Sequence, residues 1–368
     1  MRVGLIIYGG LDTLSGGYLY DRHLVEYLRG CGDTVEVISL PPGSYARHLV
    51  DNLSNNPWSR LQAAQLDVLL QDELNHPSLL RLNRRLRGRV SYPIVSIVHH
   101  LRGSEQHAPG EQDFYKWIER QYLASVDAFI CNSETTRRAI GAALDRAELR
   151  ERGSVVAHPA GNRFTTTLTP EQIQRRVDHS GPLRVVFVGN IIRRKGLLIL
   201  LEALLKLPIG TCQLIVVGNT DLDALYMRVV YHLLMVTQLP GVTLAGVVGD
   251  EELAAILAHS DVLVVPSEYE GFGIAYLEGM GFGLPAIGTT SGGAGEIITD
   301  GVNGYLVPPN DPAAVAHCLM NLAANRSKLA HMSRAAYEKY SAWPGWAENM
   351  ARVRKALLSW IGNPTNKT

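Results

Sequence analysis

Residues 1–40, MRVGLIIYGG LDTLSGGYLY DRHLVEYLRG CGDTVEVISL, contain the pattern that predicts the fold. Val3–Tyr8 is an apolar run of strand length, and a loop rich in glycine follows it. A helical pattern then runs from Tyr18 to Arg29, and Thr34–Leu40 is the next strand candidate. On one side of that helix we expect Leu19, His23, Leu24, Tyr27 and Leu28. Strands that are apolar throughout are buried on both faces, which indicates a parallel sheet covered by helices.

The same alternation of strands and helices continues through the chain. The further strand candidates are Val68–Leu70, Ile94–Val98, Ala128–Cys131 and Val155–Ala157, then Leu183–Val188, Gln213–Val217, Val262–Val265 and Pro285–Gly288. Residues 161–182 are richer in Thr, Pro and polar residues and are expected to be a linker. We therefore predict an α/β protein with two Rossmann-like, doubly wound domains, 1–165 and 166–340, facing a central cleft at the carboxyl ends of their strands. Residues 341–368 are predicted to form an amphipathic helical tail.

The composition excludes several classes of protein. The 368 residues are 46% hydrophobic and 19% charged, which suits two domains with substantial cores and argues against disorder. A formal net charge of +0 argues against a nucleic-acid-binding protein. The four cysteines form no C-x-x-C pair, which favours a reducing compartment. No segment approaches the ~20 apolar residues of a membrane span, so we expect a cytoplasmic protein, at most peripheral at the inner face of the membrane.

The segment 266–296, PSEYEGFGIAYLEGMGFGLPAIGTTSGGAGE, has the densest concentration of candidate site residues. Glu270 follows a strand, and glycines on the way into the next helix let the backbone approach a ligand closely. The start of that helix offers free N–H groups to an anion such as a diphosphate. Glu278 lies two helical turns further on, and two carboxylates suit the hydroxyl groups of a sugar or ribose. On these residues alone, two ordinary surface glutamates are an equal alternative.

Residues 187–196, FVGNIIRRKG, combine a strand, a glycine turn and the basic cluster Arg193, Arg194 and Lys195. Cations are unfavourable at the start of a helix, so a bound anion explains this cluster better than a basic helix start without a ligand. The sequence therefore predicts a diphosphate site here.

His99 stands at the carboxyl end of a predicted strand, a position that suits hydrogen bonding or proton transfer, although a structural histidine is the alternative. Adjacent side chains on an extended chain point in different directions, so His99 and His100 are a poor metal pair. The pair Gly16 and Gly17 is weak evidence by itself, and the absence of G-x-G-x-x-G in that loop argues against a nicotinamide site. The motif Asp221-Leu222-Asp223 resembles a D-x-D metal site, but an N-cap is the better interpretation of these aspartates.

The segment 266–296 resembles the donor site of the family-4 retaining glycosyltransferases, which have the GT-B fold. Their pattern P-S-x-x-E-G-F-G-x-x-x-x-E is followed by G-G-x-x-E, here Gly292 to Glu296, and the resemblance covers essentially the whole chain in order. It implies that Glu270 lies by the donor sugar and that Glu278 binds the ribose. It also implies that the backbone around Gly271, Phe272, Gly273 and Ile274 contacts the sugar and the diphosphate.

The resemblance extends to the basic cluster. The family pattern is G-R-x-x-x-x-K-G, with the arginine and the lysine on the phosphates. This chain keeps Lys195 but has Asn190 where the arginine usually stands, so Arg194 or Arg193 is expected to supply the missing charge.

Two elements of the first half also match the family. Gly16 and Gly17 correspond to a glycine pair that faces the donor phosphates and the acceptor. His99 corresponds to a histidine near the donor sugar, and His100 replaces the aspartate that usually follows it. In similar proteins the C-terminal tail, here 341–368, crosses back onto the first domain.

The resemblance implies retaining transfer of a hexose from a UDP- or GDP-sugar to a glycan or lipid-linked acceptor. Glu270, His99 and Lys195 would be catalytic, and no metal or cofactor would be required. A nucleotide-sugar epimerase or phosphorylase on the same fold is one alternative. A non-catalytic sugar-nucleotide-binding protein is another, which Asn190 keeps open.

A basic run interleaved with leucines lies in the predicted acceptor-side domain, at Arg81, Arg84, Arg85, Arg87 and Arg89. It predicts either contact with anionic lipid headgroups or a lipid-linked phosphate, or a solvated helix face. These two interpretations are equally compatible with the sequence.

Overall fold

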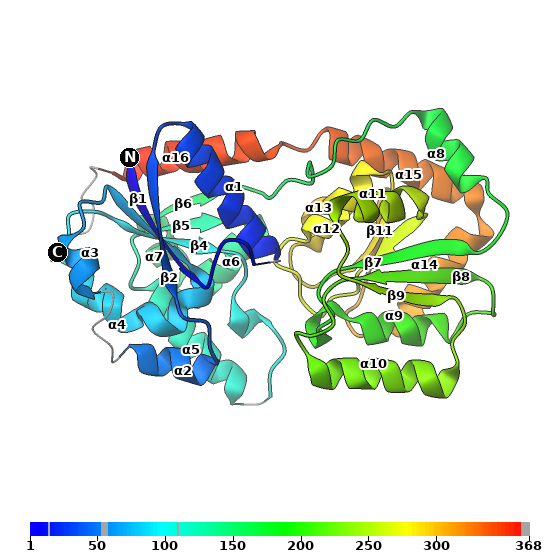
Figure 1. The fold of residues 1–368 in the computed structure, drawn as a ribbon, viewed down its shortest axis with the longest axis horizontal. Coiled ribbons are helices and arrows are strands. Elements are labelled where there is room, and N and C mark those ends of the chain that lie inside the picture. Colours follow the sequence, from blue (N-terminus) through cyan, green and yellow to red (C-terminus); the bar gives the residue numbers. More distant parts are fainter. Residues whose placement is uncertain (14, 53–57, 109, 362–368) are drawn as a thin grey trace. The chain divides into compact units, whose positions relative to one another are not determined.

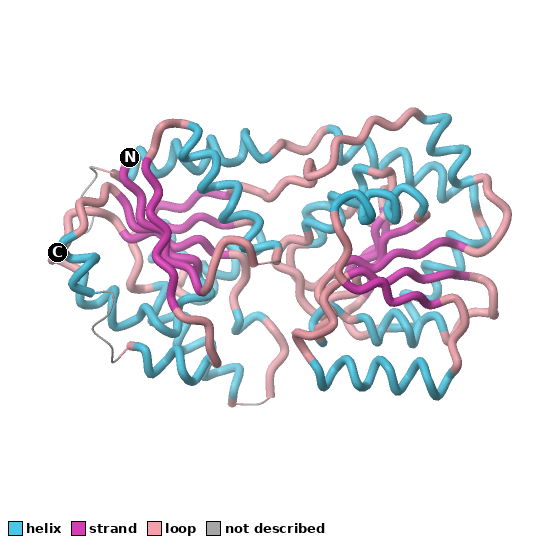
Figure 2. Tube along the Cα trace, viewed as in Figure 1, coloured by secondary structure: helices cyan, strands magenta, loops and turns pink. Residues whose placement is uncertain are grey.

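The computed structural model describes the chain except residues 14, 53–57, 109 and 362–368. The chain forms two compact units, the first made of Met1–Pro159 and Pro344–Thr368, the second of Ala160–Trp343. Each unit contains one six-stranded parallel sheet with helices on both faces (Figures 1 and 2). The predicted fold class, two Rossmann-like doubly wound domains, is confirmed. The unit boundaries lie six and three residues from those predicted after residues 165 and 340.

The first unit has the sheet order β2-β1-β3-β4-β5-β6. Its strands are β1 Arg2–Tyr8, β2 Thr34–Leu40, β3 Val68–Asp72, β4 Ile94–Val98, β5 Ala128–Cys131 and β6 Gly153–Val156. Its helices are α1 Gly16–Gly30, α2 Tyr45–Asp51, α3 Trp58–Ala63, α4 His76–Leu86, α5 Glu111–Leu123, α6 Glu134–Ala143, α7 Arg146–Glu151 and α16 Trp346–Trp360, with 3-10 helices η1 Glu73–Asn75 and η2 Arg102–Ser104. Because β2 and β3 flank β1 on opposite sides, the winding reverses between β1 and β3. Open α/β sheets bind ligands beyond the carboxyl ends of the strands at such a reversal.

Helix α1 begins after β1 and turns a different face inward from the one predicted. Leu24 and Leu28 are buried as expected, but Leu19, His23 and Tyr27 are only partly buried. The inward positions are occupied instead by Tyr18, Tyr20, Asp21 and Val25. Helical periodicity allows either set, and the direction in which the chain leaves β1 decides between them. A carboxylate is thereby placed inside the domain.

Helix α16 returns to the first unit and packs against α1 and β6. Its buried residues Trp346, Met350, Val353 and Leu357 follow helical spacing. The Trp346 ring lies at the edge of Tyr20, with ring centroids 5.8 Å apart. This tail therefore belongs to the core that positions α1.

The second unit has the sheet order β12-β11-β10-β7-β8-β9. Its strands are β7 Leu183–Val188, β8 Cys212–Val217, β9 Val242–Gly246, β10 Val262–Val264, β11 Ala286–Thr289 and β12 Gly304–Val307. Its helices are α8 Pro170–Val177, α9 Leu197–Leu204, α10 Ala224–Thr237, α11 Asp250–His259, α12 Ile274–Gly281, α13 Ala294–Ile297, α14 Pro312–Ala324 and α15 Arg326–Ser341, with η3 Arg193–Lys195. Here the winding reverses between the neighbours β7 and β10.

Several elements of the second unit are absent from the sequence prediction, among them the strands β9 and β12 and the helices α8, α14 and α15. The edge strands β9 and β12 are short and only partly buried over much of their length, so their apolar signal is weak. Helix α8 lies inside the predicted linker, where its sequence is polar and only Ile173 and Val177 are buried. A capping box stabilises its start: the Thr169 hydroxyl accepts the backbone N–H of Gln172, and the Gln172 side chain accepts that of Thr169.

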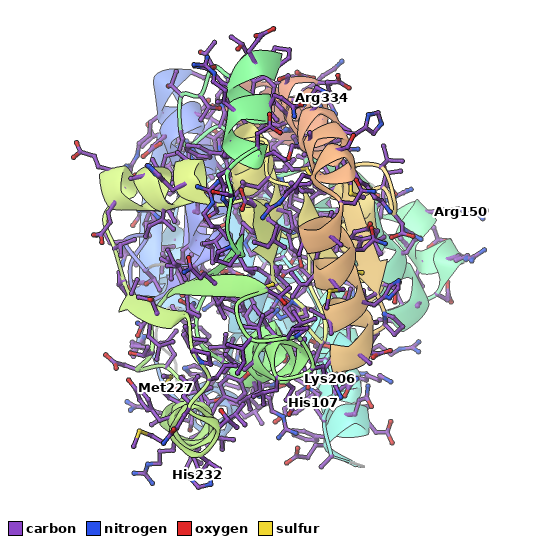
Figure 3. All side chains as sticks on the ribbon, turned by 90° about the vertical axis from the view of Figure 1, so that its right-hand side faces the viewer. His107, Arg150, Lys206, Met227, His232 and Arg334 are labelled. Carbon is purple, nitrogen blue, oxygen red and sulfur yellow. The ribbon has the colours of Figure 1, made fainter. Side chains whose placement is uncertain are left out.

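Helix α10 carries apolar residues both on the face that packs against the core and on the face exposed to solvent. Tyr226, Met227 and Val230 face the core, while Leu225, Val229, Met235 and Val236 are exposed. Figure 3 looks onto this unit and shows His232 on the outer side of the helix. None of the described helices is long and apolar enough to cross a membrane.

Adjacent valines on α10 provide a matched test of this placement. Val230 is fully buried and Val229 is 52% exposed. Replacing Val230 by Ala removes two buried methyl groups and should lower the free energy of unfolding by about 2 kcal/mol. The same change at Val229 should alter it by less than about 0.5 kcal/mol. Urea denaturation of both variants measures the difference, and equal losses would contradict the orientation of α10.

Candidate functional site

The two predicted donor loops leave neighbouring strands of the second unit. Strand β7 pairs with β10 through Val185 opposite Val262 and Val186 opposite Leu263. The loop after β7 carries the basic cluster, and the loop after β10 carries Glu270. Both loops therefore lie at the carboxyl edge, where the winding reverses.

An ion pair joins these loops. The Lys195 Nζ donates to Oε2 of Glu270 at 2.6 Å, and the Ser267 hydroxyl donates to the same oxygen at 3.1 Å. Glu270 is 8% exposed. Burial opposes its ionisation, but the charges of Lys195 and Arg194 and the two hydrogen bonds hold the pKa of Glu270 below its usual range. Glu270 is thus a carboxylate with a fixed orientation.

Arg194, rather than Arg193, lies beside Glu270. Its Nη1 donates to the Tyr269 carbonyl at 2.9 Å, and its own carbonyl accepts the N–H of Glu268 at 2.8 Å. Arg193 is exposed. Of the two arginines considered as replacements for the charge absent at Asn190, Arg194 is therefore the one held against the Glu270 loop.

Glycines are required where these loops approach other backbone. Gly196 has φ +73°, and a Cβ there would lie 2.1 Å from the Pro266 carbonyl oxygen. Gly292 has φ +90°, and its Cβ would lie 2.1 Å from the Glu270 carbonyl oxygen. The N–H of Gly293 donates to that oxygen at 2.6 Å. The pair Gly292-Gly293 thus has a structural role, since it fixes the loop that carries Glu270.

Helix α12 begins directly after this loop, with Gly273 as its N-cap at φ +100° and no side-chain cap. The first N–H groups of the helix therefore have no side-chain acceptor at the cap, and a helix start of this kind can bind an anion. The Phe272 side chain is 2% exposed and lies 5.8 Å from the Trp343 ring. Gly271, Phe272 and Gly273 are predicted ligand contacts. Because the Phe272 side chain is buried, Phe272 can contact a ligand only through its backbone.

Glu278 lies on α12 and is 6% exposed. Burial raises its pKa to about 7, and the charge of Arg163 moderates that increase. The Arg163 Nη1 is 3.8 Å from Glu278 Oε1, and its Nη2 also pairs with Asp250. Arg163 was not predicted as a site residue, because it stands alone in the polar segment between the domains and no local pattern marks it.

In the first unit the structure brings Gly17 and His99 together. A Cβ at Gly17 would lie 3.0 Å from the His99 Cδ2, so the imidazole ring occupies the space that glycine leaves. His99 follows β4, and its backbone carbonyl accepts Nδ2 of Asn132 at 2.7 Å. The Nε2 of the ring is 3.3 Å from Asp21 Oδ1.

Burial would lower the pKa of His99, but the nearby Asp21 carboxyl group, with the charges of Asp72 and Glu73, raises it to about 9. Asp21 and Asp72 were not predicted as site residues. Asp21 stands within a helix of mixed polarity, and Asp72 ends a strand, so neither carries a distinctive motif.

Within the described residues, two buried groups have the spacing that a metal ion needs, Asp21 with Asp72 and His99, and Glu73 with His76 and Glu119. The first contains the ion pair of Asp21 with His99. In the second, burial raises the pKa of Glu73 and of Glu119 to about 8 and lowers that of His76 to about 4, so all three side chains are mainly uncharged at neutral pH.

Two other motifs have structural explanations. Asp223 is the N-cap of α10 and accepts the N–H of Tyr226 at 3.0 Å, which confirms the capping interpretation of the D-x-D motif. In the basic run, Leu79, Leu82 and Leu86 are part of the first unit's core.

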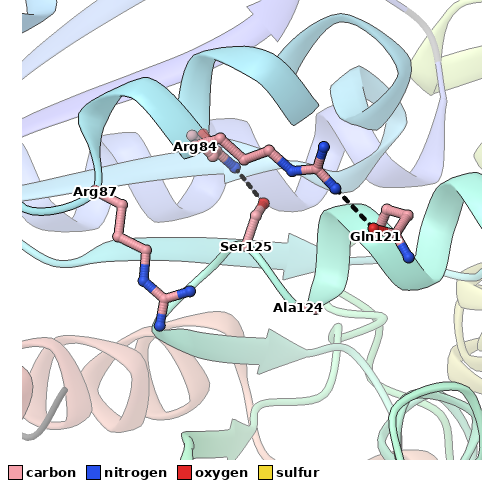
Figure 4. A pocket seen from close by; sticks show the side chains of 6 residues that line it. Arg84, Arg87, Gln121, Ala124 and Ser125 are labelled. Atoms are coloured by element: carbon pink, nitrogen blue, oxygen red, sulfur yellow. Dashed lines mark hydrogen bonds between the residues drawn. The ribbon is translucent and has the colours of Figure 1, made fainter. Parts of the chain in front are cut away.

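The arginines of the basic run remain near the surface. Arg84 donates to Gln121 Oε1 at 2.7 Å, beside a small pocket at the ends of α4 and α5 (Figure 4). The residues that line this pocket are Asn83, Arg84, Arg87, Gln121, Ala124 and Ser125. Because α4 and α5 end where β4 and β5 begin, the pocket lies at the opposite edge of the sheet from His99.

The sequence model of one protein family, the glycosyl transferases group 1, matches residues 182–325, which include Lys195, Glu270 and Glu278. This part of the chain is therefore similar to the group 1 glycosyl transferases. Its similarity to an uncharacterized glycosyltransferase, MJ1607 of Methanocaldococcus jannaschii, is 31% identity over 48% of this chain and 46% of that protein. The D-rhamnosyltransferase WbpZ of Pseudomonas aeruginosa is 28% identical over 88% of this chain and 90% of WbpZ.

The chain spans about half the length of the first curated relatives that it matches. A solved structure covers more. HepE of Anabaena, in complex with UDP-glucose, has a TM-score of 0.75 over 98% of this chain and 100% of that chain, at 19% identity. This similarity shows that the chain has the GT-B fold.

Replacing Lys195 by Met tests the ion pair of this glycosyl transferase domain. The change leaves a buried carboxylate without its cation, so we expect a loss of about 2 kcal/mol in the free energy of unfolding at neutral pH. Because the Glu270 carboxylate causes this loss, the difference from wild type should shrink as acid protonates Glu270. Lys206→Met, at an exposed lysine (Figure 3), is the control and should be neutral. A loss that does not depend on pH would contradict the pairing.

Proposed function

We propose that the protein transfers a hexose from a UDP- or GDP-sugar to a glycan or lipid-linked acceptor, with retention of anomeric configuration. The observation that carries this proposal is the Lys195–Glu270 pair at the winding reversal of the second unit. The match of residues 182–325 to the glycosyl transferase family model supports it, as does the similarity to a protein solved with UDP-glucose.

The basic loop supplies the charge for a diphosphate. An ammonium group has three N–H donors, and one of those on Lys195 is occupied by Glu270, so two are available to phosphate oxygens. Arg194 and the N-terminal N–H groups of α12 add further positive potential. These groups would stabilise the departing nucleoside diphosphate, where negative charge develops in the transition state. We therefore propose that the reaction requires no metal ion or other cofactor.

The two glutamates differ in charge and so suit different partners. Glu270 is held ionised and can accept hydrogen bonds from sugar hydroxyl groups. Glu278 has a pKa of about 7 and can either accept or donate a hydrogen bond near neutral pH. We assign Glu270 to the donor sugar and Glu278 to the ribose. His99 and the pair Gly16 and Gly17, from the first unit, complete the proposed donor and acceptor contacts.

For the basic run we propose contact with an anionic acceptor or membrane surface through charge alone. Leu79, Leu82 and Leu86 are buried in the core, so the contact would be made through Arg81, Arg84, Arg85 and Arg87. The interaction should then weaken steeply with salt.

The central experiment combines a thermal-shift panel of UDP-, GDP- and ADP-hexoses with mass spectrometry of the products. Glu270→Gln keeps the shape of the side chain but removes its charge, and we expect at least about a hundredfold loss of transfer with little change in Tm. Glu202→Gln, at an exposed residue of α9, is the control and should retain activity. Full activity in Glu270→Gln would reject the proposed donor site. Release of a free isomer or a sugar phosphate would indicate an epimerase or a phosphorylase, and stabilisation without turnover would indicate a binding protein.

Gly17→Ala tests the first-unit contact. The new Cβ would lie 3.0 Å from the His99 Cδ2 and would push the ring out of its present position. Because catalytic groups act only from well-defined positions, we expect transfer to fall by about ten- to a hundredfold. Gly10→Ala is the matched control, because a Cβ there would have no atom within 4 Å. Initial rates under saturating donor measure the effect. Equal rates in the two variants would show that the position of His99 is unimportant.

A further inference from the structure

The carboxylate of Asp21 lies inside the first unit in an unusual state. Asp21 is fully buried, and neither of its oxygens has a conventional hydrogen bond. Burying a carboxylate without compensation costs several kcal/mol. The His99 Nε2, 3.3 Å from Oδ1, is the positive partner within the described residues that compensates this charge. The two side chains come from α1 and from the end of β4.

The His99 ring is held on several sides. Gly17 packs against one part of the ring, and Tyr20 lies at its edge with ring centroids 5.4 Å apart. Tyr20 is fixed in turn, since its hydroxyl donates to the Ala157 carbonyl at 3.1 Å. The backbone of His99 is fixed by Asn132. With the ring confined in this way, Nε2 stays directed at Asp21.

Only one member of this group can reach a ligand. Asp21 and Asp72 are completely buried, whereas His99 retains 8% of its surface. Asp21 therefore acts on any substrate only through the imidazole ring.

We propose that Asp21 is a positioning residue, which orients the His99 ring and keeps it positively charged. The pairing of Asp21 with His99 is a property of the first unit alone. Only its expected effect on transfer rests on the proposed function. A charged imidazole has no free lone pair, so His99 would act as a hydrogen-bond donor and a fixed cation. It would not act as the general base that a histidine at this position first suggests.

The charges of the neighbouring groups agree with this assignment. The groups that face His99 are Asp21 and Tyr20 of α1 and Asp72 and Glu73 at the end of β3. Burial and the charge of Asp21 raise the pKa of Asp72 to about 8, and burial raises that of Glu73 to about 8, so both are mainly neutral at pH 7. Asp21 is then the acidic side chain that contacts the ring directly, with Oδ1 3.3 Å from Nε2.

Asp72 can partly replace Asp21. Because the charge of Asp21 raises the pKa of Asp72, removing Asp21 lets Asp72 ionise more easily. The single variant Asp21→Asn should therefore show a smaller effect than the double variant Asp21→Asn with Asp72→Asn. This graded response distinguishes an electrostatic role from a loss of packing.

The test is an NMR titration of histidine-labelled protein, with the His99 signal assigned through His99→Gln. In wild type we expect an imidazolium at pH 7.5 that loses its proton near pH 9. In Asp21→Asn the midpoint should fall by about one unit or more, and further in the double variant. Glu26→Gln is the control, because Glu26 lies exposed on the same helix and should leave the midpoint unchanged.

Activity gives a second readout. Transfer by Asp21→Asn should decline at a lower pH than transfer by wild type, and the difference between the two should shrink in acid, where the ring is protonated in both. A neutral His99 in wild type at pH 7.5, or an unchanged midpoint in a folded Asp21→Asn, would overturn the inference. The titration needs no substrate, so a failure of the proposed transfer reaction would leave it as a separate result.

Discussion

The ion pair between Lys195 and Glu270 is the interaction on which the candidate donor site depends. It joins residues 75 positions apart, on loops that leave two adjacent strands. Without the charge of Lys195, burial would favour the neutral, protonated form of the Glu270 side chain. Gly196 lets the Lys195 loop approach the backbone of Pro266, and Gly292, on the loop after β11, lets a third loop approach the backbone of Glu270.

Each of the two units contains a buried acidic side chain next to a basic one. Each places a buried carboxylate and a cation beyond the carboxyl edge of its sheet, Glu270 with Lys195 in one and Asp21 with His99 in the other. Such groups are costly in a protein interior and persist where neighbouring charges are fixed in compensating positions. Perturbed ionisable groups gathered at a winding reversal are typical of functional sites.

Much of the fold followed from periodicity. The strands Ile94–Val98, Ala128–Cys131 and Leu183–Val188 have the predicted bounds, because buried parallel strands are continuous apolar runs. Thr34–Leu40 also has the predicted bounds, although it lies at the edge of its sheet and alternates between buried and exposed residues. Edge strands such as β9 have one exposed side and a weaker signal, and α8 is mostly polar, so both escaped prediction. The candidate donor residues were found from motif and spacing, since Lys195 and Glu270 lie in glycine-containing loops after strong strands.

The sequence by itself determined the α/β class, the two-domain division and the chemical character of the donor loops, since these depend on local apolar runs, glycines and charges. Only the tertiary structure decided which charges meet. In the structure Arg194, and not Arg193, lies against the Glu270 loop. Asp21, and not His23, faces the interior of the first domain. Arg163 lies beside Glu278. Such pairings depend on strand order and on the rotation of helices about their axes. A rotation of one residue position, about 100° in an α-helix, exchanges a buried side chain for an exposed one while leaving the sequence pattern almost equally satisfied.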